Sequence, residues 1–291
     1  MRALTKICGV GLTVLALLSG GVGMALAGSI VAWGDNTYGV VSHAPTFTDF
    51  VRVAGSSYGA LALRSNGSIV AWGDDSSFQV TDTPTGTGFK AVAGDGVINL
   101  ALRSDGSIDV WGYDYWSGTP YSMITGAPMG TGFTAIDGNS NSGIALHSDG
   151  SLAVWGDDGQ AQVSGAPTGT GFTAVATNGY GCLALGPLGR IYGWGFVPFY
   201  QPTGTGFVAI ALNWASTALA MRSDGSIVVW GYNGQYTVTT IVKGKNVVTT
   251  YYHPSLISLA PKGTGFTSLG GSGLEYGPDV VQGVGLAIHG P

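Results

Sequence analysis

The side chains able to carry out chemistry are few and scattered in this sequence. Its histidines occupy unrelated positions and lack the spacing typical of metal ligands. They are His43, His147, His253 and His289. Cys8 lies in an N-terminal apolar run, which leaves Cys182 without an internal disulfide partner. No glycine-rich loop precedes a convincing helix, as phosphate binding would need. The sequence therefore predicts no enzyme, no metal site and no cofactor.

Aspartate is the ionisable residue that recurs, and it recurs in two settings. Several stand in Ser-Asp-Gly sequences, where an Asx turn explains them. The Ser-x-Asp-x-Gly-x-x-Trp spacing of sialidase Asp boxes is absent, because Ser, Asp and Gly are contiguous here. Others directly follow Trp-Gly pairs, as at Asp74-Asp75 and Asp157-Asp158, where calcium binding stays open. A hydrolase with axial carboxylates is the least favoured interpretation.

The elements that must position these residues are internal repeats. A Trp-Gly pair recurs at Trp33, Trp72, Trp111, Trp155, Trp194 and Trp230, with spacings of 39, 39, 44, 39 and 36. A Phe-led apolar run recurs at Phe50, Phe89, Phe133, Phe172, Phe207 and Phe266. The alternation in FTAVA, LALR and SIVAW predicts three half-buried strands in each unit, and a short fourth strand is expected beside them. Asn-Gly or Asp-Gly pairs between the second and third strands predict tight hairpin turns.

Sheets of this size cannot bury their faces alone, so stacking is expected. Radial stacking predicts an all-β, closed β-propeller of six blades that forms a single domain over residues 28–291. The strand at 29–33 is expected to complete the last blade, which holds Phe266 and Leu286. The alternative is seven blades with one degenerate blade inside 232–262. An insertion is favoured there, with a hairpin turning at 243–246.

Residues 1–27 are predicted to be an export signal. Arg2 and Lys6 precede an apolar run that ends in Ala25-Leu26-Ala27, and a retained membrane anchor fits less well. No later stretch is long and apolar enough to span a bilayer. The remaining chain has nine basic against sixteen acidic residues, a net charge of −7, which argues against nucleic acid as a partner. We expect a secreted or periplasmic protein.

The repeated ALRSDGSIVAWG resembles the repeat of the chromosome-condensation-regulator propellers over essentially all of residues 28–291. The short units, the export signal and the Trp-Gly-first order are most similar to the exported propeller-type β-lactamase inhibitor proteins of bacteria. That resemblance implies a protein that binds another protein and is not an enzyme. The family commonly has seven blades, and its usual His after the turn is absent here, so the chain departs from it in both respects.

The repeat Trp and Phe residues are interpreted as packing between blades. Specificity is expected in the loops that vary between units. In the inhibitor proteins the loops after Trp-Gly and before Leu-Ala-Leu form the target-binding face. The resemblance points to Asp35, Tyr38, Tyr58, Asp74, Phe78, Asp157, Tyr180 and Trp214, and the insertion in the longest unit adds Tyr115 and Trp116. The expected partner is an extracellular or periplasmic protein. A carbohydrate-binding or cell-surface propeller is the alternative, and loop aromatics that only cap the channel also stay open.

Overall fold

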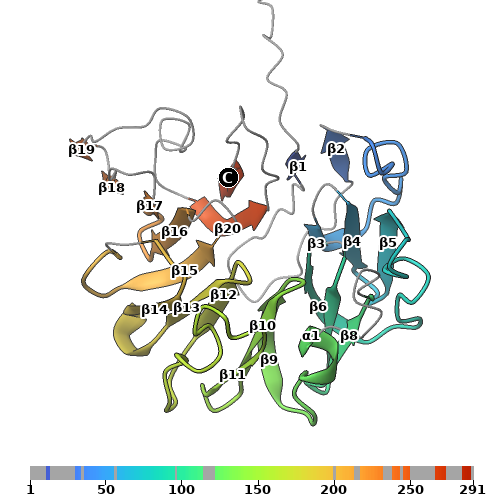
Figure 1. Cartoon of the computed structure of the whole chain (residues 1–291). Coiled ribbons are helices and arrows are strands. Elements are labelled where there is room, and N and C mark those ends of the chain that lie inside the picture. The colour runs from blue at the N-terminus through green and yellow to red at the C-terminus, as the bar shows by residue number, and fades with distance from the viewer. Residues whose placement is uncertain are drawn as a thin grey trace, which may run out of the picture.

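A computed structural model gives the arrangement of the strands (Figure 1). It describes residues 11–13, 30–33, 36–55, 58–95, 97–113, 122–198, 201–212, 217–231, 238–242, 245–249, 266–272 and 284–289. The two helical segments within these ranges are α1 (Ser122–Thr125), a single turn, and the 3-10 turn η1 (Pro187–Gly189). None of the described helices is long and apolar enough to cross a membrane.

Five successive units form antiparallel sheets in which the Phe-led strand comes first, the Leu-Ala-Leu strand lies in the middle and the Trp-Gly strand is third. Their strands are β3 (Phe50–Gly55), β4 (Gly59–Arg64) and β5 (Ile69–Gly73); β6 (Phe89–Gly94), β7 (Asn99–Arg103) and β8 (Ile108–Trp111); β9 (Phe133–Gly138), β10 (Ser142–His147) and β11 (Leu152–Gly156); β12 (Ala174–Thr177), β13 (Gly181–Leu185) and β14 (Ile191–Gly195); β15 (Phe207–Leu212), β16 (Thr217–Arg222) and β17 (Ile227–Gly231). The three predicted strands are confirmed in all five units, whereas the expected short fourth strand is not found among the described residues of the first four.

The hairpin turns between the second and third strands also follow the prediction. In sheet β6–β8, Asp105 Oδ1 accepts the Ser107 backbone N–H at 2.9 Å, and Gly106 has a φ of 87°. Glycine adopts this left-handed conformation without steric cost. The fourth unit differs, because Leu188 takes the place of the aspartate, with a φ of 60° and 83% of its surface exposed.

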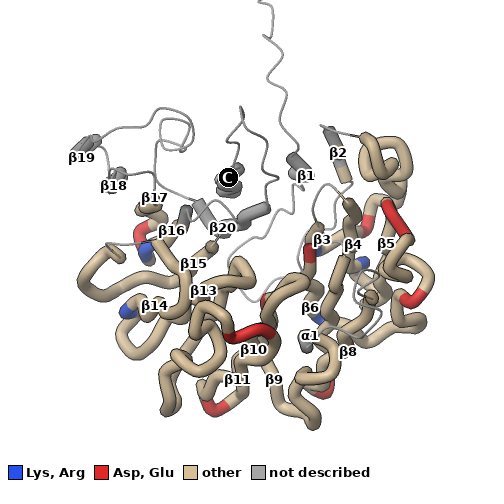
Figure 2. Tube along the Cα trace, viewed as in Figure 1, with Lys and Arg blue, Asp and Glu red and all other residues tan. Residues whose placement is uncertain are grey.

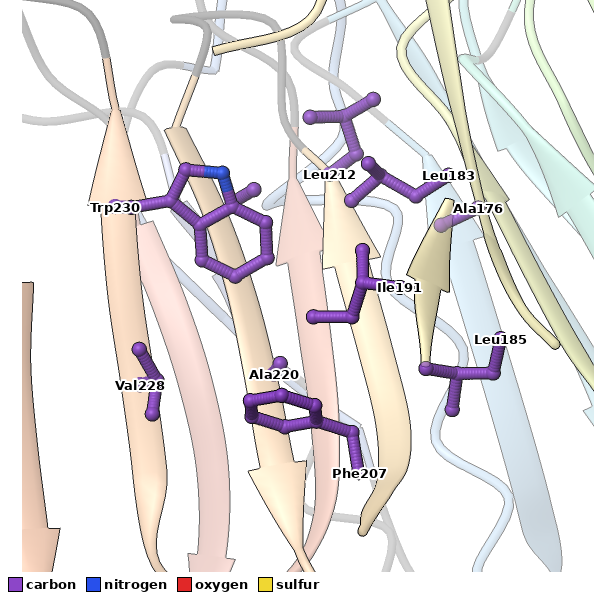
Figure 3. Packing of buried hydrophobic residues seen from close by; sticks show 10 residues of the cluster. Ala176, Leu183, Leu185, Ile191, Phe207, Leu212, Ala220, Val228 and Trp230 are labelled. Atoms are coloured by element: carbon purple, nitrogen blue, oxygen red, sulfur yellow. The ribbon is translucent and has the colours of Figure 1, made fainter. Parts of the chain in front are cut away.

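The sheets follow one another around a common centre (Figure 1). Strands β3, β6, β9, β12, β15 and β20 (Phe266–Ser272) contact each other in that order, so the Phe-led strands are innermost. Each sheet packs its faces against its neighbours, as the propeller architecture requires. Between sheets β12–β14 and β15–β17, for example, Leu183, Phe207 and Trp230 meet in one buried cluster (Figure 3).

The repeat tryptophans are structural, as predicted. Each described Trp-Gly tryptophan from Trp72 onward is buried. Four indole Nε1 groups donate a hydrogen bond to the main-chain carbonyl 32 positions earlier, which lies in the loop after the preceding Trp-Gly pair. The pairs are Trp72 with Val40 (2.8 Å), Trp111 with Gln79 (3.0 Å), Trp155 with Met123 (2.8 Å) and Trp194 with Gln162 (2.8 Å). Trp230 Nε1 finds no acceptor among the described residues, and its unit is shorter, at 36 residues.

The predicted hairpin in the long segment after Trp230 is present, but its turn is shorter than the predicted 243–246, because Lys245 already lies in a strand. Strands β18 (Val238–Val242) and β19 (Lys245–Thr249) pair antiparallel with Val242 opposite Lys245. Thr240 of β18 pairs with Val228 of β17, so the hairpin extends the fifth sheet at its outer edge.

The two ends of the chain do not pair as predicted in the part that the structure describes. Strand β20 pairs with β21 (Val284–His289) to give a two-stranded sheet. Strand β2 (Val31–Trp33) pairs with β1 (Gly11–Thr13), with Ala32 opposite Leu12. Strand β1 lies inside the predicted export signal. The described strands thus show five sheets of three or more strands, and the expected third strand of the sixth sheet is paired elsewhere.

Candidate functional site

The two loop positions that vary between units lie at the same end of the sheets. Gly59 and Gly73 face each other across β4 and β5, and the Asp74 N–H donates to the Tyr58 carbonyl at 2.8 Å. The same 2.8 Å bond joins Asp157 N to Asn141 O and Phe196 N to Tyr180 O. We call this end the variable rim, made of residues 36–44, 58, 74–82, 95, 97–98, 112–113, 139–141, 157–165, 178–180 and 196–198. The hairpin turns form the opposite end, the turn rim.

The loop after Trp-Gly has one backbone design in three units. Asn36 Oδ1 accepts the N–H groups of Val41 and Ser42, both at 2.9 Å. Asp75 Oδ1 accepts Val80 N and Thr81 N, and Asp158 Oδ1 accepts Val163 N and Ser164 N, all at 2.8 to 2.9 Å. A short polar side chain that caps its own loop in this way fixes the loop without help from a partner.

The predicted site residues Asp74 and Asp157 also serve their own loops. Asp74 Oδ2 accepts Gln79 Nε2 at 3.2 Å, and Asp157 Oδ2 accepts Gln162 Nε2 at 3.0 Å. Both glutamine side chains are buried. These carboxylates therefore shape the loop base, while Asp157 remains exposed and Asp74 half-buried. Asp35, the third predicted aspartate, lies outside the described residues.

The aromatic site residues come together in pairs. The rings of Tyr38 and Tyr58 lie 5.0 Å apart at their centroids. The rings of Phe78 and Tyr113 lie 6.3 Å apart in an edge-to-face arrangement. Tyr38 is 37% exposed and Phe78 is 50% exposed, so part of each side chain remains accessible to solvent.

Tyr180 is placed on the variable rim by backbone hydrogen bonds, through its N–H to Asn178 Oδ1 and its carbonyl to Phe196 N. Phe196 was missed by the sequence reasoning, although it is 49% exposed on this rim. It follows Trp194-Gly195 directly, where three of the other units have Asp and two have Tyr, and that aromatic replacement was the available signal. The remaining predicted aromatics lie outside the described residues: Tyr115, Trp116 and Trp214.

Apart from His43, every ionisable Asp, Glu, Lys, Arg or His side chain in the described loops of the variable rim is an aspartate. Its described loops contain six aspartates and no Lys, Arg or Glu, the aspartates being Asp74, Asp75, Asp82, Asp95, Asp157 and Asp158. Slight burial tends to raise the pKa of the Asp75 carboxyl, but hydrogen bonds from Thr81 and Val80 outweigh it and lower the pKa. Hydrogen bonds from Ser164 and Val163 lower the pKa of Asp158. Both groups are therefore ionised at neutral pH.

The turn rim has mixed charge, and Figure 2 shows basic and acidic residues along the chain. Arg103 and Arg222 precede turns that contain Asp105 and Asp224, whereas the turns after Arg64 and before Arg190 contain no aspartate. Arg64 Nε is 2.9 Å from Asp49, and Arg103 pairs with Asp109. Each of the four guanidinium groups also lies over an aromatic ring. The pairs are Arg64 with Phe47, Arg103 with Phe89, Arg190 with Tyr192 and Arg222 with Phe207.

Two aspartates cross-link neighbouring sheets near the variable rim, and the sequence did not predict them. Asp95 Oδ2 accepts Ser140 N at 2.9 Å and Ser140 Oγ at 2.6 Å. Asp137, at the end of β9, accepts Thr177 N at 2.8 Å. Burial raises the pKa of Asp137 to about 6, against the opposing effect of hydrogen bonds from Thr177 and Gly138. The residue as a whole is half-buried.

Cys182 lies beside this cross-link and is not a nucleophile of the ordinary kind. Burial raises the pKa of its thiol to about 12, a hydrogen bond with Thr177 opposes the shift, and nearby Asp137 adds to it. A thiol with such a pKa is protonated at neutral pH and unreactive. In the part of the chain that the structure describes, no three His, Cys, Asp or Glu side chains gather as a metal site would require.

The fold itself has close counterparts among solved structures, although no protein family profile and no curated protein matches this chain. The ectodomain of the receptor kinase CR4 from Physcomitrella patens has a TM-score of 0.59 at 19% identity, covering 72% of this chain and 60% of that one. The CRINKLY WD40 ectodomain of ACR4 from Arabidopsis thaliana has a TM-score of 0.57 at 22% identity, covering 75% and 84%.

The Saccharomyces cerevisiae protein Prp20p, the yeast RCC1, has a TM-score of 0.52 at 16% identity, covering 69% of this chain and 67% of its own. These similarities, together with the sheets described above, show an all-β fold of the β-propeller kind. The chain spans 60% of the CR4 ectodomain.

Proposed function

We propose that this protein is a secreted, non-enzymatic propeller that binds another protein through its variable rim. The observation that carries the proposal is the convergence of both varying loop positions on one rim, where exposed aromatic rings stand among six aspartates. Aromatic anchors in a polar surround are typical of protein interfaces. Structural relatives are described as bound to Kap60 and as having binding properties toward Gsp1p and histones, which supports binding as the use of this fold.

The partner that we propose is an extracellular or periplasmic protein, and the role is that of an inhibitor or recognition module. The resemblance to the exported bacterial inhibitor propellers makes class A β-lactamases the first candidates. The binding residues would be the described Tyr38, Tyr58, Phe78 and Tyr180, with Asp35, Tyr115, Trp116 and Trp214 on the neighbouring loops. Asp74 and Asp157 would contribute charge and hold the loops in place.

A capture experiment with residues 28–291 tests this proposal. The immobilised protein would be exposed to culture medium, to periplasmic extract and to purified class A β-lactamases. We expect a captured protein whose affinity falls about thirtyfold, or about 2 kcal/mol, for Tyr58→Ala or Trp116→Ala. Phe47→Ala, on the turn rim, is the matched control and should leave affinity unchanged. Capture that survives the rim variants, or that free sugars abolish, would overturn the proposal and in the second case favour a lectin.

Export and ring closure belong together in this proposal. We infer that residues 1–27 are removed on export, which takes away β1 and leaves the edge of β2 unpaired. The sheet β20–β21 lacks the Trp-Gly strand that every other sheet has, and β2 is a Trp-Gly strand. Pairing β2 with β21 would give six blades and remove both open edges.

Ring closure can be tested with a designed disulfide. By the register of β16 and β17, Leu286 would lie opposite Ala32. In residues 28–291 with Cys182→Ala, the double substitution Ala32→Cys and Leu286→Cys should then form a disulfide spontaneously. The control pair Ala32→Cys with Val284→Cys is out of register and should stay reduced. Equal cross-linking of both pairs would show that the two strands do not pair in this register.

A further inference from the structure

Phe78 of the variable rim has a strained backbone conformation that costs the fold free energy, and this points to a role in binding. The loops after Trp-Gly place Gly39, Phe78 and Ala161 at the same point of the shared loop design. Their φ angles are 76°, 58° and 57°, all in the left-handed region. Glycine fits there without strain, whereas a bulky aromatic residue in this region is an outlier.

Phe78 gains little from packing in return for this strain. Half of its surface is exposed, and its ring contact is the edge of Tyr113. Tyr113 comes from the end of β8, one unit further along, so the two rings bridge neighbouring loops. Strained residues that the fold does not need tend to cluster at functional sites.

The chemistry around these rings specifies what they would bind. Ring faces carry negative electrostatic potential, which attracts a guanidinium or ammonium group. On the turn rim this chain supplies that cation itself, with guanidinium carbons 4.2 Å from the Phe47 and Phe207 ring centroids and 4.5 Å from that of Phe89. The described loops of the variable rim contain neither Lys nor Arg. No lysine or arginine cation of this chain is thus available to Phe78 from the described loops of its own rim. Phe78 shares its loop with Ser76 and with Asp75, and the carboxylate of Asp75 is ionised.

We propose that Phe78 and Tyr113 form a receptor for an arginine or lysine side chain of a partner protein, with the aspartates of the variable rim attracting a basic surface around it. This inference rests on the proposed function and names the chemistry of the partner. The occupant is a basic segment of a protein, because the rim is acidic and an anionic ligand would be repelled.

The binding test uses defined probes. A fluorescent peptide of Arg-Gly-Gly repeats is compared with Lys-Gly-Gly and Glu-Gly-Gly peptides of equal length, at low salt and at about 0.3 M NaCl. We expect the Arg and Lys peptides to bind, the Glu peptide not to bind, and salt to weaken binding. Phe78→Gly and Tyr113→Ala should each weaken binding of the Arg peptide by about tenfold. Unchanged binding in Phe78→Gly, or equal binding of the Glu peptide, would overturn the proposal.

A stability measurement supplies the second arm and needs no ligand. Phe78→Gly relieves the left-handed strain, so its Tm should rise by about 2 °C. Ala161→Gly is the matched control, because it relieves the same strain at the equivalent position without removing a ring. It should raise Tm similarly and leave peptide binding unchanged. A fall in Tm for Phe78→Gly would show that the ring serves the fold, and the receptor assignment would then be wrong.

The two proposals can fail separately. A captured protein that loses affinity in Tyr58→Ala but binds Phe78→Gly normally would leave the proposed function standing and overturn the receptor. Binding of the Arg peptide without any captured protein would leave the receptor standing and overturn the proposed function.

Discussion

The turn rim and the variable rim sit at opposite ends of the same strands, yet they use their side chains in different ways. On the turn rim, Arg64 lies over Phe47 and pairs with Asp49, so cation, ring and carboxylate satisfy one another. On the variable rim the backbone of the loop is preserved while the side chain at its left-handed position changes from Gly39 to Phe78 to Ala161. A repeated frame can therefore keep one end fixed for stability and leave the other end to specify a partner.

The largest effect should follow from removing a tryptophan at the base of a variable loop. Trp111 is 6% exposed and its indole N–H bonds to Gln79 O at 3.0 Å, so Trp111→Ala should lower the free energy of unfolding by about 3–5 kcal/mol. Tyr38→Ala, an exposed ring on the same rim, should cost no more than about 0.5 kcal/mol. Denaturant unfolding measures both. Similar losses for the two variants would contradict the division between a structural frame and exchangeable side chains.

A pH-dependent effect should separate the two rims next. Burial raises the pKa of Asp137 from the ordinary 3.8 to about 6, so the folded protein holds this proton more tightly than the unfolded chain. The resulting stability is present below about pH 4 and is lost as the pH rises through about 6. Asp137→Asn stays neutral, and it should be more stable than wild type at pH 7.5 by at most about 3 kcal/mol, because the half-buried residue is partly screened by solvent.

Asp149→Asn on the turn rim is the control with the opposite sign. Hydrogen bonds from the Ser151 hydroxyl and backbone lower the pKa of Asp149, so this carboxylate stabilises the fold at neutral pH and stops doing so in acid. Urea unfolding at several pH values should therefore show Asp149→Asn less stable than wild type at pH 7.5. A pH profile for Asp137→Asn parallel to that of wild type would show that Asp137 does not titrate in this range.

The smallest effect concerns the one hairpin turn that departs from the others. Leu188 has a φ of 60° and is 83% exposed, so it combines backbone strain with an exposed apolar side chain. Asparagine tolerates this conformation better, and Leu188→Asn should raise the free energy of unfolding by about 0.5–1 kcal/mol. Calorimetry can resolve such a change, for which Asp105→Asn in a regular turn is the comparison. If Leu188→Asn were destabilising, the turn rim would hold a side chain with a use of its own.

Much of the fold could be predicted because its signals are local and repeated. The alternation in FKAVAG and NLALR is enough to give β6 and β7, and Asp105-Gly106 is enough to give the turn after β7. The burial of Trp111 followed from its position at the end of an apolar strand. That the two varying loops share a face was expected only from the resemblance to the inhibitor propellers, and the antiparallel order of the strands explains why they lie at one end.

What sequence reasoning missed depends on single residues and on distant pairing. Asp137 stands where the other units have alanine or, in the last unit, glycine. Its carboxyl accepts Thr177 N from the next sheet, and burial raises its pKa, which depends on contacts that no local pattern encodes. The loops of Asp74 and Asp157 gave no local sign that these carboxylates would bind buried glutamines five residues later. Phe78 carries no mark of its left-handed backbone in its residue type, because phenylalanine is rarely found there. The pairing of β2 depends on contacts between the ends of the chain, which local patterns do not encode.

The tryptophan bonds have a consequence for how such a protein can change. Four of the repeat indole N–H groups donate to a main-chain carbonyl, and the residues that supply it are as different as Val40, Gln79, Met123 and Gln162. Because every residue type has that carbonyl, the hydrogen bond does not constrain which side chain stands at the position. The loop is held at its base by the following unit while its sequence is free to drift. A lineage could thus exchange one loop at a time for a new target, and each intermediate protein along the way would still fold.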